Sequence, residues 1–356
     1  MKYYIIAGEA SGDLYASNLM RGLRTCDPGC EIRFRGSEAM TPVMGILEVV
    51  GKAGQVLKNL AACQKDLLAW QPDAVILIDY PGFNLRIARF AHAHGLKVFY
   101  YIAPKVWAHA GHRLRRLKRD VDVLYCIFPF EPAWFRARGL EPRYFGHPLQ
   151  ECLAQWPFKE IEGDRIVLLP GSRSSELRFL MPRYAELERL LAADARFDRF
   201  RLFIAAAPSI PVGDYRRWLP ADSRIEVLPG RTYDLLAGAS AAVICSGTAN
   251  LEAALLGTPQ VVCYGFRRLT WWIARLTVKL RFVSPVNLCL DRGAVAELLQ
   301  DQASAAEMFR HLERLLFDAG VREKLQQDYT ELKTLLGDAR VAERIAQDIY
   351  GEIARI

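Results

Sequence analysis

Short apolar runs that alternate with longer amphipathic stretches are the feature that most limits how this chain can fold. One amphipathic stretch carries Tyr15, Leu19 and Leu23 at a spacing of four residues, which places them on one face of a helix. Such alternation is typical of parallel strands joined by crossover helices. The strands expected in the first half are Tyr3–Ala7, Ile32–Phe34, Ala74–Ile78, Val98–Ile102 and Val123–Ile127.

The alternation stops near residues 150–163, where turn formers gather, and then restarts. A chain of 356 residues also exceeds what one hydrophobic core usually supports. After about residue 293 we expect almost only helix. The second set of expected strands is Arg165–Leu169, Arg201–Ala206, Ile225–Leu228, Ala241–Cys245 and Gln260–Tyr264.

We therefore predict an α/β protein with two Rossmann-like, doubly wound domains that face a cleft. Ligands of open α/β sheets bind outside the carboxyl ends of the strands, so both sets of strand ends are expected to face that cleft. The predicted domains are residues 1–155 and residues 156–335. A last helical segment, residues 336–356, either stays with the second domain or returns to the first.

Composition excludes several classes of protein. The net charge of +7 suits an anionic partner without choosing among phosphate, membrane and nucleic acid, but no nucleic-acid-binding signature accompanies it. The eight cysteines contain no CxxC pair, so neither a metal site nor a disulfide framework is expected. No apolar stretch is long enough for a signal peptide or a membrane span. We expect a soluble protein that at most leans on a membrane.

Two clusters follow strands in the first half. The small residues of Gly8–Asp13 let the backbone approach a ligand, although they also suit a tight turn in which Asp13 favours the helix dipole. Asp79 stands at the end of a strand, where a carboxylate can take a proton from a hydroxyl. The alternative is that Asp79 only accepts hydrogen bonds from the start of the next helix.

Three further segments carry aromatic or apolar residues beside cations. The segment that ends in Trp107 offers aromatic faces for sugar, and the basic run after it is either a lipid or phosphate contact or a solvated helix face. Residues 271–282 suit an interfacial helix or a core helix with snorkelling cations, and residues 42–47 share this ambiguity. The candidate lipid or membrane contacts are Val43, Met44, Ile46, Trp107, Trp271 and Trp272.

Two turns in the second half are candidates for phosphate binding. Gly171, Ser172 and Arg173 follow a strand and open a helix, a layout that can hold a phosphate by backbone amides and a guanidinium. The lysine of an ATP-binding P-loop is missing. At Ser246–Glu252 the turn amides can meet a diphosphate while the carboxylate accepts ribose hydroxyls; simple helix capping is the alternative.

In this order the clusters closely resemble the lipid-A-disaccharide synthase family, whose members are inverting transferases of the glycosyltransferase-B fold. The resemblance runs from the first strand to about residue 300, which is most of the chain. The matching segments are GEASGD (8–13), VMGILEVV (43–50), DYPGFN (79–84), YYIAPKVWA (100–108), PFE (129–131), GHP (146–148), LPGSR (169–173), SGTANLE (246–252), SPVNL (284–288) and ELLQ (297–300).

The resemblance implies a reaction and a setting. The family joins UDP-2,3-diacylglucosamine to 2,3-diacylglucosamine 1-phosphate and releases UDP, in the biosynthesis of lipid A. It therefore implies a cytoplasmic hexosyltransferase that associates peripherally with the inner membrane. No cofactor, metal or nucleic acid is implied, and the oligomeric state stays open.

By position the resemblance also implies roles. Asp79 matches the candidate general base, while Glu9 and Asp13 match a loop that faces the reacting sugars. The positions implied to bind substrate or UDP are Ser11, Gly171, Ser172, Arg173, Ser246, Gly247, Thr248, Glu252, Asn287, Glu297 and Gln300. The chain departs from the common family pattern at Tyr15-Ala16, at Gly82 and at His109, where His-Gly, Asp and Trp are common. Without the second carboxylate, Asp79 is the only one left in its motif.

Two other functions remain open at this point. The chain could be another UDP-N-acetylhexosamine enzyme of the same fold, either an epimerase or a hexosaminyltransferase. An epimerase would not need apolar patches for acyl chains, and activity on unacylated UDP-N-acetylglucosamine would favour it. A non-catalytic nucleotide- or lipid-binding protein is the other alternative, and tight UDP binding without transfer would favour that.

Overall fold

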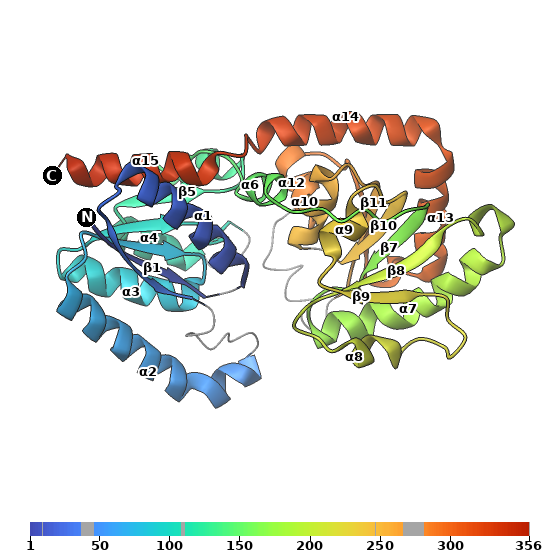
Figure 1. Ribbon diagram of the computed structural model, residues 1–356, viewed down its shortest axis with the longest axis horizontal. Coiled ribbons are helices and arrows are strands. Elements are labelled where there is room, and N and C mark those ends of the chain that lie inside the picture. Colours follow the sequence, from blue (N-terminus) through green and yellow to red (C-terminus); the bar gives the residue numbers. More distant parts are fainter. Residues whose placement is uncertain (9, 37–45, 108–110, 246, 266–280, 356) are drawn as a thin grey trace. The chain divides into compact units, whose positions relative to one another are not determined.

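The computed structural model of the chain describes residues 1–8, 10–36, 46–107, 111–245, 247–265 and 281–355. It divides into two compact units, which are coloured along the sequence in Figure 1. Unit 1 is Met1–Gln155 with Leu336–Ile356, and unit 2 is Trp156–Leu335. Each unit holds a six-stranded sheet in which neighbouring strands run parallel.

Unit 1 has the strand order β2-β1-β3-β4-β5-β6. Its strands are β1 (Lys2–Ala7), β2 (Glu31–Arg35), β3 (Ala74–Ile78), β4 (Lys97–Tyr101), β5 (Val123–Cys126) and β6 (Arg143–Tyr144). Its helices are α1 (Ala10–Cys26), α2 (Ile46–Trp70), α3 (Pro81–Ala93), α4 (Leu114–Asp120), α5 (Glu131–Arg136), α6 (Leu149–Ala154) and α15 (Val341–Ala354).

Helices cover both faces of this sheet, which is why its central strands are continuous apolar runs. All five residues of β3 are buried. Val75, Leu77 and Tyr100 point to the face that α2, α3 and α4 cover, where they form one hydrophobic core with Ile87 and Leu117. In Figure 1, α1 and α15 lie over the opposite face.

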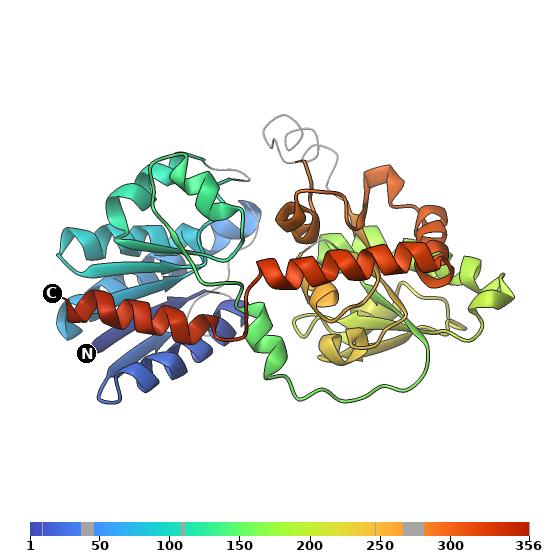
Figure 2. The ribbon, with the colours of Figure 1, turned by 90° about the horizontal axis from the view of Figure 1, so that it is seen from above.

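The last helix, α15, packs along α1 on unit 1, as Figure 2 shows in red and blue. Gly22 makes this close approach possible, because a Cβ on it would lie 3.0 Å from the Cβ of Ala346 and 3.1 Å from the carbonyl oxygen of Ala342. Polar contacts add to the packing. The guanidinium of Arg143 pairs with Asp348 and Glu352 of α15.

Unit 2 has the strand order β12-β11-β10-β7-β8-β9. Its strands are β7 (Arg165–Leu169), β8 (Arg201–Ala206), β9 (Glu226–Pro229), β10 (Ala241–Cys245), β11 (Gln260–Tyr264) and β12 (Ala296–Leu299). Its helices are α7 (Ser174–Ala192), α8 (Val212–Arg216), α9 (Thr232–Leu236), α10 (Thr248–Leu255), α12 (Pro285–Leu290), α13 (Ala305–Phe317) and α14 (Ala319–Leu335).

Several expectations about secondary structure were wrong, including the placement of Ile127 and Ile225, which lie just outside β5 and β9. The chain after residue 293 is not almost entirely helical, because β12 forms the edge of the second sheet and pairs with β11. Its four residues, AELL, are good helix formers, so tertiary pairing overrides local propensity there. Ile102 lies outside β4 and has a positive φ of 66°, a rare conformation for a β-branched residue.

Within the described residues no helix combines the length and the apolar character that a membrane span requires.

We predict that Gly22→Leu lowers the free energy of unfolding of unit 1 by about 1–3 kcal/mol, because the larger side chain would force α15 away from α1. Urea unfolding followed by circular dichroism measures this change. Gly351→Leu is the matched control on α15, since a Cβ on Gly351 meets nothing within 4 Å. Equal destabilisation by both substitutions would contradict the close packing at Gly22.

Candidate functional site

In open α/β sheets, ligands bind at the carboxyl ends of the two neighbouring strands between which the strand order reverses. In unit 1 the chain moves from β1 outward to β2 and then crosses to β3, so the order reverses between β1 and β3. In unit 2 it reverses between β7 and β10. The turns that leave these four strands contain Gly8, Asp79, Arg173 and Thr248, all of which belong to the sequence clusters.

The backbone of Asp79 is held in an unusual conformation directly after β3. Asp79 and Tyr80 both have a φ of 46°, in the left-handed region that non-glycine residues seldom adopt. The Asp79 carbonyl oxygen accepts hydrogen bonds from the Tyr100 hydroxyl, at 2.6 Å, and from the Asn84 amide, at 2.8 Å. Strained residues of this kind persist where surrounding contacts fix them, and they cluster at active sites.

The carboxyl group of Asp79 has the properties of a proton acceptor. It is partly buried, and this burial raises the pKa of Asp79. The charge of Lys105 and a hydrogen bond from the backbone N–H of Tyr80 lower the pKa and offset part of that rise. Within the described residues no cation forms an ion pair with Asp79. A carboxylate whose pKa is raised toward neutrality is better matched to accepting a proton from a hydroxyl.

The first loop of unit 1 is shorter than expected, because α1 begins at Ala10. Ser11 is exposed and Asp13 lies partly buried in the first turn of α1, beside Gly36 at the end of β2. Gly8 lies against the Tyr80 ring, since a Cβ on it would come within 2.2 Å of Tyr80 Cγ. The structure thus brings Gly8 to the Asp79 turn, whereas Asp13 lies on the β2 side of β1.

Trp107, a candidate lipid contact, has local packing partners. Its indole N–H donates to Glu131 Oε1 at 2.8 Å, and its ring lies edge-on to Phe128 and Phe130. Glu131 is fully buried, and this burial raises the pKa of its carboxyl group. The side chain is half-buried, so a lipid role for Trp107 stays a prediction.

Several predicted site residues lie outside the described residues. These are Glu9, Val43, Met44, Ser246, Trp271 and Trp272, together with His109 among the departures from the family pattern. Ile46, expected in an apolar loop, is the first residue of α2.

The first phosphate candidate of unit 2 differs from expectation, because Glu176 already occupies its amides. Glu176 Oε2 accepts hydrogen bonds from the backbone N–H groups of Ser172, at 3.0 Å, and Arg173, at 3.2 Å. A Cβ on Gly171 would lie 2.2 Å from the same oxygen. That these amides hold a phosphate stays a prediction, and it requires Glu176 to give up its hydrogen bonds to them. The spacing of Glu176 three residues after the helix N-cap is the sequence signal for this capping.

The guanidinium of Arg173 remains the cation of this turn. It lies 3.2 Å from Glu176 Oε1 and also hydrogen-bonds the Tyr264 hydroxyl, yet the side chain is 54% exposed. Glu176 and Tyr264 therefore orient the guanidinium without covering it. An arginine held in this way can donate hydrogen bonds to the oxygens of a phosphate.

The second candidate turn keeps its helix start exposed. Gly247 and Thr248 are exposed, and no side chain among the described residues caps α10. The first N–H groups of α10 are consequently available to an anion. Glu252 lies one turn further on and hydrogen-bonds Tyr233. Burial raises the pKa of Glu252 to about 7, so its carboxylate titrates near neutrality.

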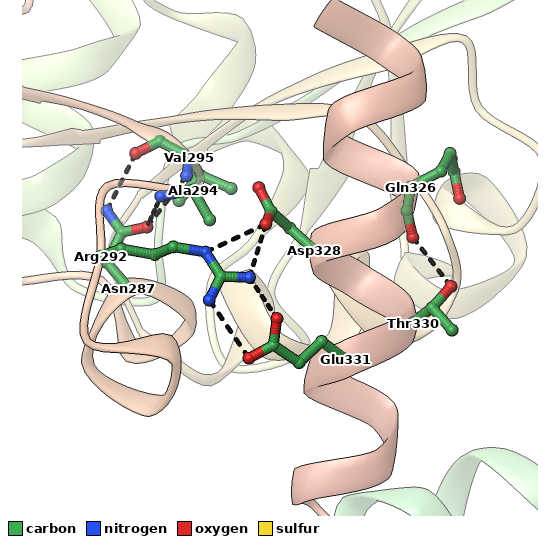
Figure 3. Close-up of polar contacts among 8 residues, drawn as sticks. All are labelled: Asn287, Arg292, Ala294, Val295, Gln326, Asp328, Thr330 and Glu331. Carbon is green, nitrogen blue, oxygen red and sulfur yellow. Dashed lines mark hydrogen bonds and ion pairs between the residues drawn. The ribbon is translucent and has the colours of Figure 1, made fainter.

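Asn287, expected near the UDP phosphates, is buried. Its side-chain amide hydrogen-bonds only to other residues of the protein, and Figure 3 shows some of these bonds. Its Oδ1 accepts from the N–H groups of Ala294 and Val295, both at 2.9 Å. Its Nδ2 donates to the Val295 carbonyl oxygen, at 2.9 Å, and to Glu297 Oε1, at 2.8 Å. An amide has two donors and one oxygen acceptor, so no capacity is left for a phosphate. A direct contact of Asn287 with the UDP phosphates stays a prediction; in this structure Asn287 positions its neighbours.

Glu297 completes the same network. Its carboxylate accepts from the N–H groups of Val283 and Ser284, both at 2.9 Å, as well as from Asn287. Gln300 directly follows β12 with a positive φ of 55°. A sugar-nucleotide contact of Glu297 or Gln300 stays a prediction. Among the described residues, no group of three histidine, cysteine, aspartate or glutamate side chains could hold a metal ion.

Comparison with known sequences identifies close similarity over nearly the whole chain. The model of a family described as lipid-A-disaccharide synthetase matches residues 3–349. A lipid-A-disaccharide synthase of Myxococcus xanthus is 34% identical over 352 residues, 92% of this chain and 91% of that protein. One of Anaeromyxobacter dehalogenans (strain 2CP-C) is 35% identical over 376 residues, 98% of this chain and 96% of that protein.

Solved structures share the fold at much lower identity. The UDP-GlcNAc 2-epimerase of Neisseria meningitidis, bound to UDP-GlcNAc, has a TM-score of 0.71 at 12% identity and covers 99% of this chain and 100% of its own. The spinosyn rhamnosyltransferase SpnG has a TM-score of 0.59 at 15% identity, covering 97% and 99%. These likenesses confirm the predicted glycosyltransferase-B type of fold, with a parallel-sheet α/β unit in each half.

We predict that Asn287→Ala lowers the free energy of unfolding of unit 2 by roughly 2–4 kcal/mol, because it leaves the N–H groups of Ala294 and Val295 without their acceptor. Urea unfolding measures the change. Gln327→Ala, on the exposed side of α14, is the control and should have little effect. Unchanged stability together with lost UDP binding would instead restore the direct phosphate contact.

We predict a pH dependence of stability that comes from Glu252. Its pKa is about 7 in the folded chain against an ordinary value of 4.5, so folding favours the protonated form. Stability is then lost as pH rises from about 4.5 to about 7, on the order of 3 kcal/mol in all. Glu252→Gln should remove this loss in urea unfolding at about pH 5 and about pH 8. The exposed Glu323→Gln serves as control, and identical pH profiles for both variants would refute the assignment.

Proposed function

The chain belongs to the lipid-A-disaccharide synthetase family, and within the reaction of that family we propose that Asp79 is the general base and that Arg173 and α10 hold the leaving UDP. Its curated relatives are lipid-A-disaccharide synthases, so the chain is a glycosyltransferase of lipid A biosynthesis. The proposal adds which residues of this chain carry out the transfer.

The donor in this proposal is UDP-2,3-diacylglucosamine, bound by unit 2. Support comes from the exposed guanidinium of Arg173 and the uncapped start of α10, which follow the neighbouring strands β7 and β10 at the reversal of strand order. The two groups supply a fixed positive charge and aligned N–H dipoles for the diphosphate. Glu252 accepts the ribose hydroxyls when it is ionised. A structural neighbour from Staphylococcus aureus, MnaA, was solved with UDP.

The acceptor is 2,3-diacylglucosamine 1-phosphate, and its primary hydroxyl is the nucleophile. The hydroxyl oxygen forms a bond to the anomeric carbon of the donor while the bond from that carbon to the UDP oxygen breaks. The hydroxyl proton passes to the Asp79 carboxylate, and the electron pair of the broken bond leaves on UDP. Because attack occurs opposite the leaving group, the anomeric configuration inverts.

The observation that carries this proposal is the state of Asp79. Its backbone is fixed by Tyr100 and Asn84, while its carboxylate is partly buried and free of an ion pair within the described residues. A raised pKa favours proton uptake during the reaction. At the leaving group, preorganised donors such as Arg173 stabilise the developing charge.

Peripheral association with the cytoplasmic face of the inner membrane completes the proposal. Both proposed substrates carry acyl chains, so they reside in a bilayer, and the net charge of +7 favours approach to anionic lipids. No membrane-spanning segment is needed for such association.

We predict that Asp79→Asn lowers kcat about 10²- to 10⁴-fold and leaves the affinity for UDP unchanged, because it removes the proton acceptor but keeps the backbone contacts. The assay uses UDP-2,3-diacylglucosamine with 2,3-diacylglucosamine 1-phosphate and measures disaccharide and UDP. Glu141→Gln removes an exposed carboxylate of unit 1 and should retain full activity.

Two outcomes of this assay would count against the proposal. Near-normal turnover by a folded Asp79→Asn enzyme would exclude Asp79 as the base. Epimerisation of unacylated UDP-N-acetylglucosamine, without any disaccharide from the acylated substrates, would exclude the transfer reaction itself.

A further inference from the structure

Unit 2 contains a cavity at the edge of its sheet where β11 and β12 begin. The cavity has a volume of about 250 Å³ and lies between α13, α14 and residues 293–296. Gln260 and Ala296, which begin β11 and β12, are among its lining residues. Arg173 and Thr248 follow the carboxyl ends of β7 and β10. All strands are parallel, so this cavity at the amino ends is separate from the proposed UDP site.

The cavity carries an excess of positive charge. Arg314 of α13 and Lys324 of α14 line it, and neither side chain forms an ion pair or hydrogen bond within the described residues. The acidic residue of the lining, Asp328, accepts from Arg292 at 2.7 Å, and the same guanidinium also pairs with Glu331 outside the lining (Figure 3). The lining thus holds two cations, Arg314 and Lys324, against one carboxylate, Asp328, and neither cation pairs with a carboxylate within the described residues.

His311 adds a hydrogen-bonding group to the same wall. It is partly buried on α13, and burial followed by the nearby charge of Arg314 lowers its pKa. The charged groups that act on it are Arg314, Glu307 and Arg310 on its own helix, and Lys324 and Asp328 of α14 line the same cavity. A neutral imidazole can donate an N–H to an anion.

We propose that this cavity binds a phosphate group between Arg314 and Lys324. The volume admits a small anion and is below the range of pockets for drug-sized ligands. An arginine and a lysine provide several charged N–H donors, which suit phosphate oxygens. The phosphate is either free in solution or part of a lipid headgroup, since both present the same oxygens.

A phosphate in this cavity would contact a segment that matters elsewhere in unit 2. Ala294 and Val295 line the cavity, and their backbone N–H groups donate hydrogen bonds to Asn287, which is not part of the lining (Figure 3). Asn287 in turn holds Glu297. Phosphate binding would thus stabilise the Asn287–Glu297 network through Ala294 and Val295. The melting temperature of the folded chain should therefore be higher when phosphate is present.

The test is a titration of the full chain with inorganic phosphate, followed by calorimetry with UDP at saturation. The double variant Arg314→Ala/Lys324→Ala should weaken phosphate binding roughly tenfold or more. The matched control is Arg310→Ala/Arg322→Ala, which removes the same charge from the same two helices outside the lining and should bind as the unchanged chain does. Equal binding by all three proteins, or an equal loss in both variants, would overturn the proposal.

A second readout follows His311 directly. Its NMR resonance is identified by its disappearance in His311→Gln, and phosphate should raise its pKa in the unchanged chain and in the control variant. No such rise should occur in Arg314→Ala/Lys324→Ala. If phosphate does not change the pKa of His311 in the unchanged chain, that result would contradict binding at this cavity.

Vesicles distinguish the two sources of phosphate. If the cavity takes a lipid headgroup, Arg314→Ala/Lys324→Ala should lose sedimentation with vesicles of phosphatidylcholine and phosphatidic acid, while the control variant keeps it. If the cavity takes free phosphate, the double variant should sediment normally and lose only the binding of inorganic phosphate. Loss of neither kind of binding would overturn the proposal.

Discussion

Parallel strand pairing is the constraint on which the placement of every candidate residue depends. Because neighbouring strands of each sheet run in the same direction, their carboxyl ends share one edge and their amino ends share the other. The turns with Asp79 in unit 1, and with Arg173 and Thr248 in unit 2, leave from carboxyl ends next to the point where strand order reverses. A ligand can reach the sheet there because the two turns diverge to opposite faces.

Carboxylates at these edges fall into two kinds that sequence does not separate. Glu131, Glu176 and Glu297 each accept two backbone N–H groups of a loop. Their oxygens accept hydrogen bonds from the backbone, and these bonds pair N–H donors that burial would otherwise leave unpaired. Asp79 and Glu252 are different, because each carboxylate accepts only one hydrogen bond within the described residues, from Tyr80 N–H and from Tyr233, while burial raises its pKa. Chemistry is better supported at these two positions.

Much of the fold could be predicted from the sequence, because buried parallel strands are short apolar runs. Ala74–Ile78, Ala241–Cys245 and Gln260–Tyr264 begin and end where the pattern predicts. β12 could not be predicted in this way, since an edge strand of helix-forming residues has no local signal and depends on pairing with β11.

The site was less predictable, because hydrogen bonding between distant residues decides it. Asn287 and Arg173 both resemble ligand contacts in the sequence. Only the structure shows that the side-chain amide of Asn287 hydrogen-bonds residues 294–297. The return of Glu176 to the Ser172 amide was readable from its spacing and changes which groups remain for a phosphate.

The path of the chain has a consequence for how the molecule forms during synthesis. Unit 1 is built from the first 155 residues and from α15, so unit 2 is inserted between two parts of its neighbour. The surface of α1 around Gly22 has no partner until Val341–Ala354 has left the ribosome. Unit 2 is complete in the nascent polypeptide before unit 1 is, which reverses the usual order of folding from the N-terminus. A premature stop codon near the 3′ end of the message would therefore damage the unit that is translated first.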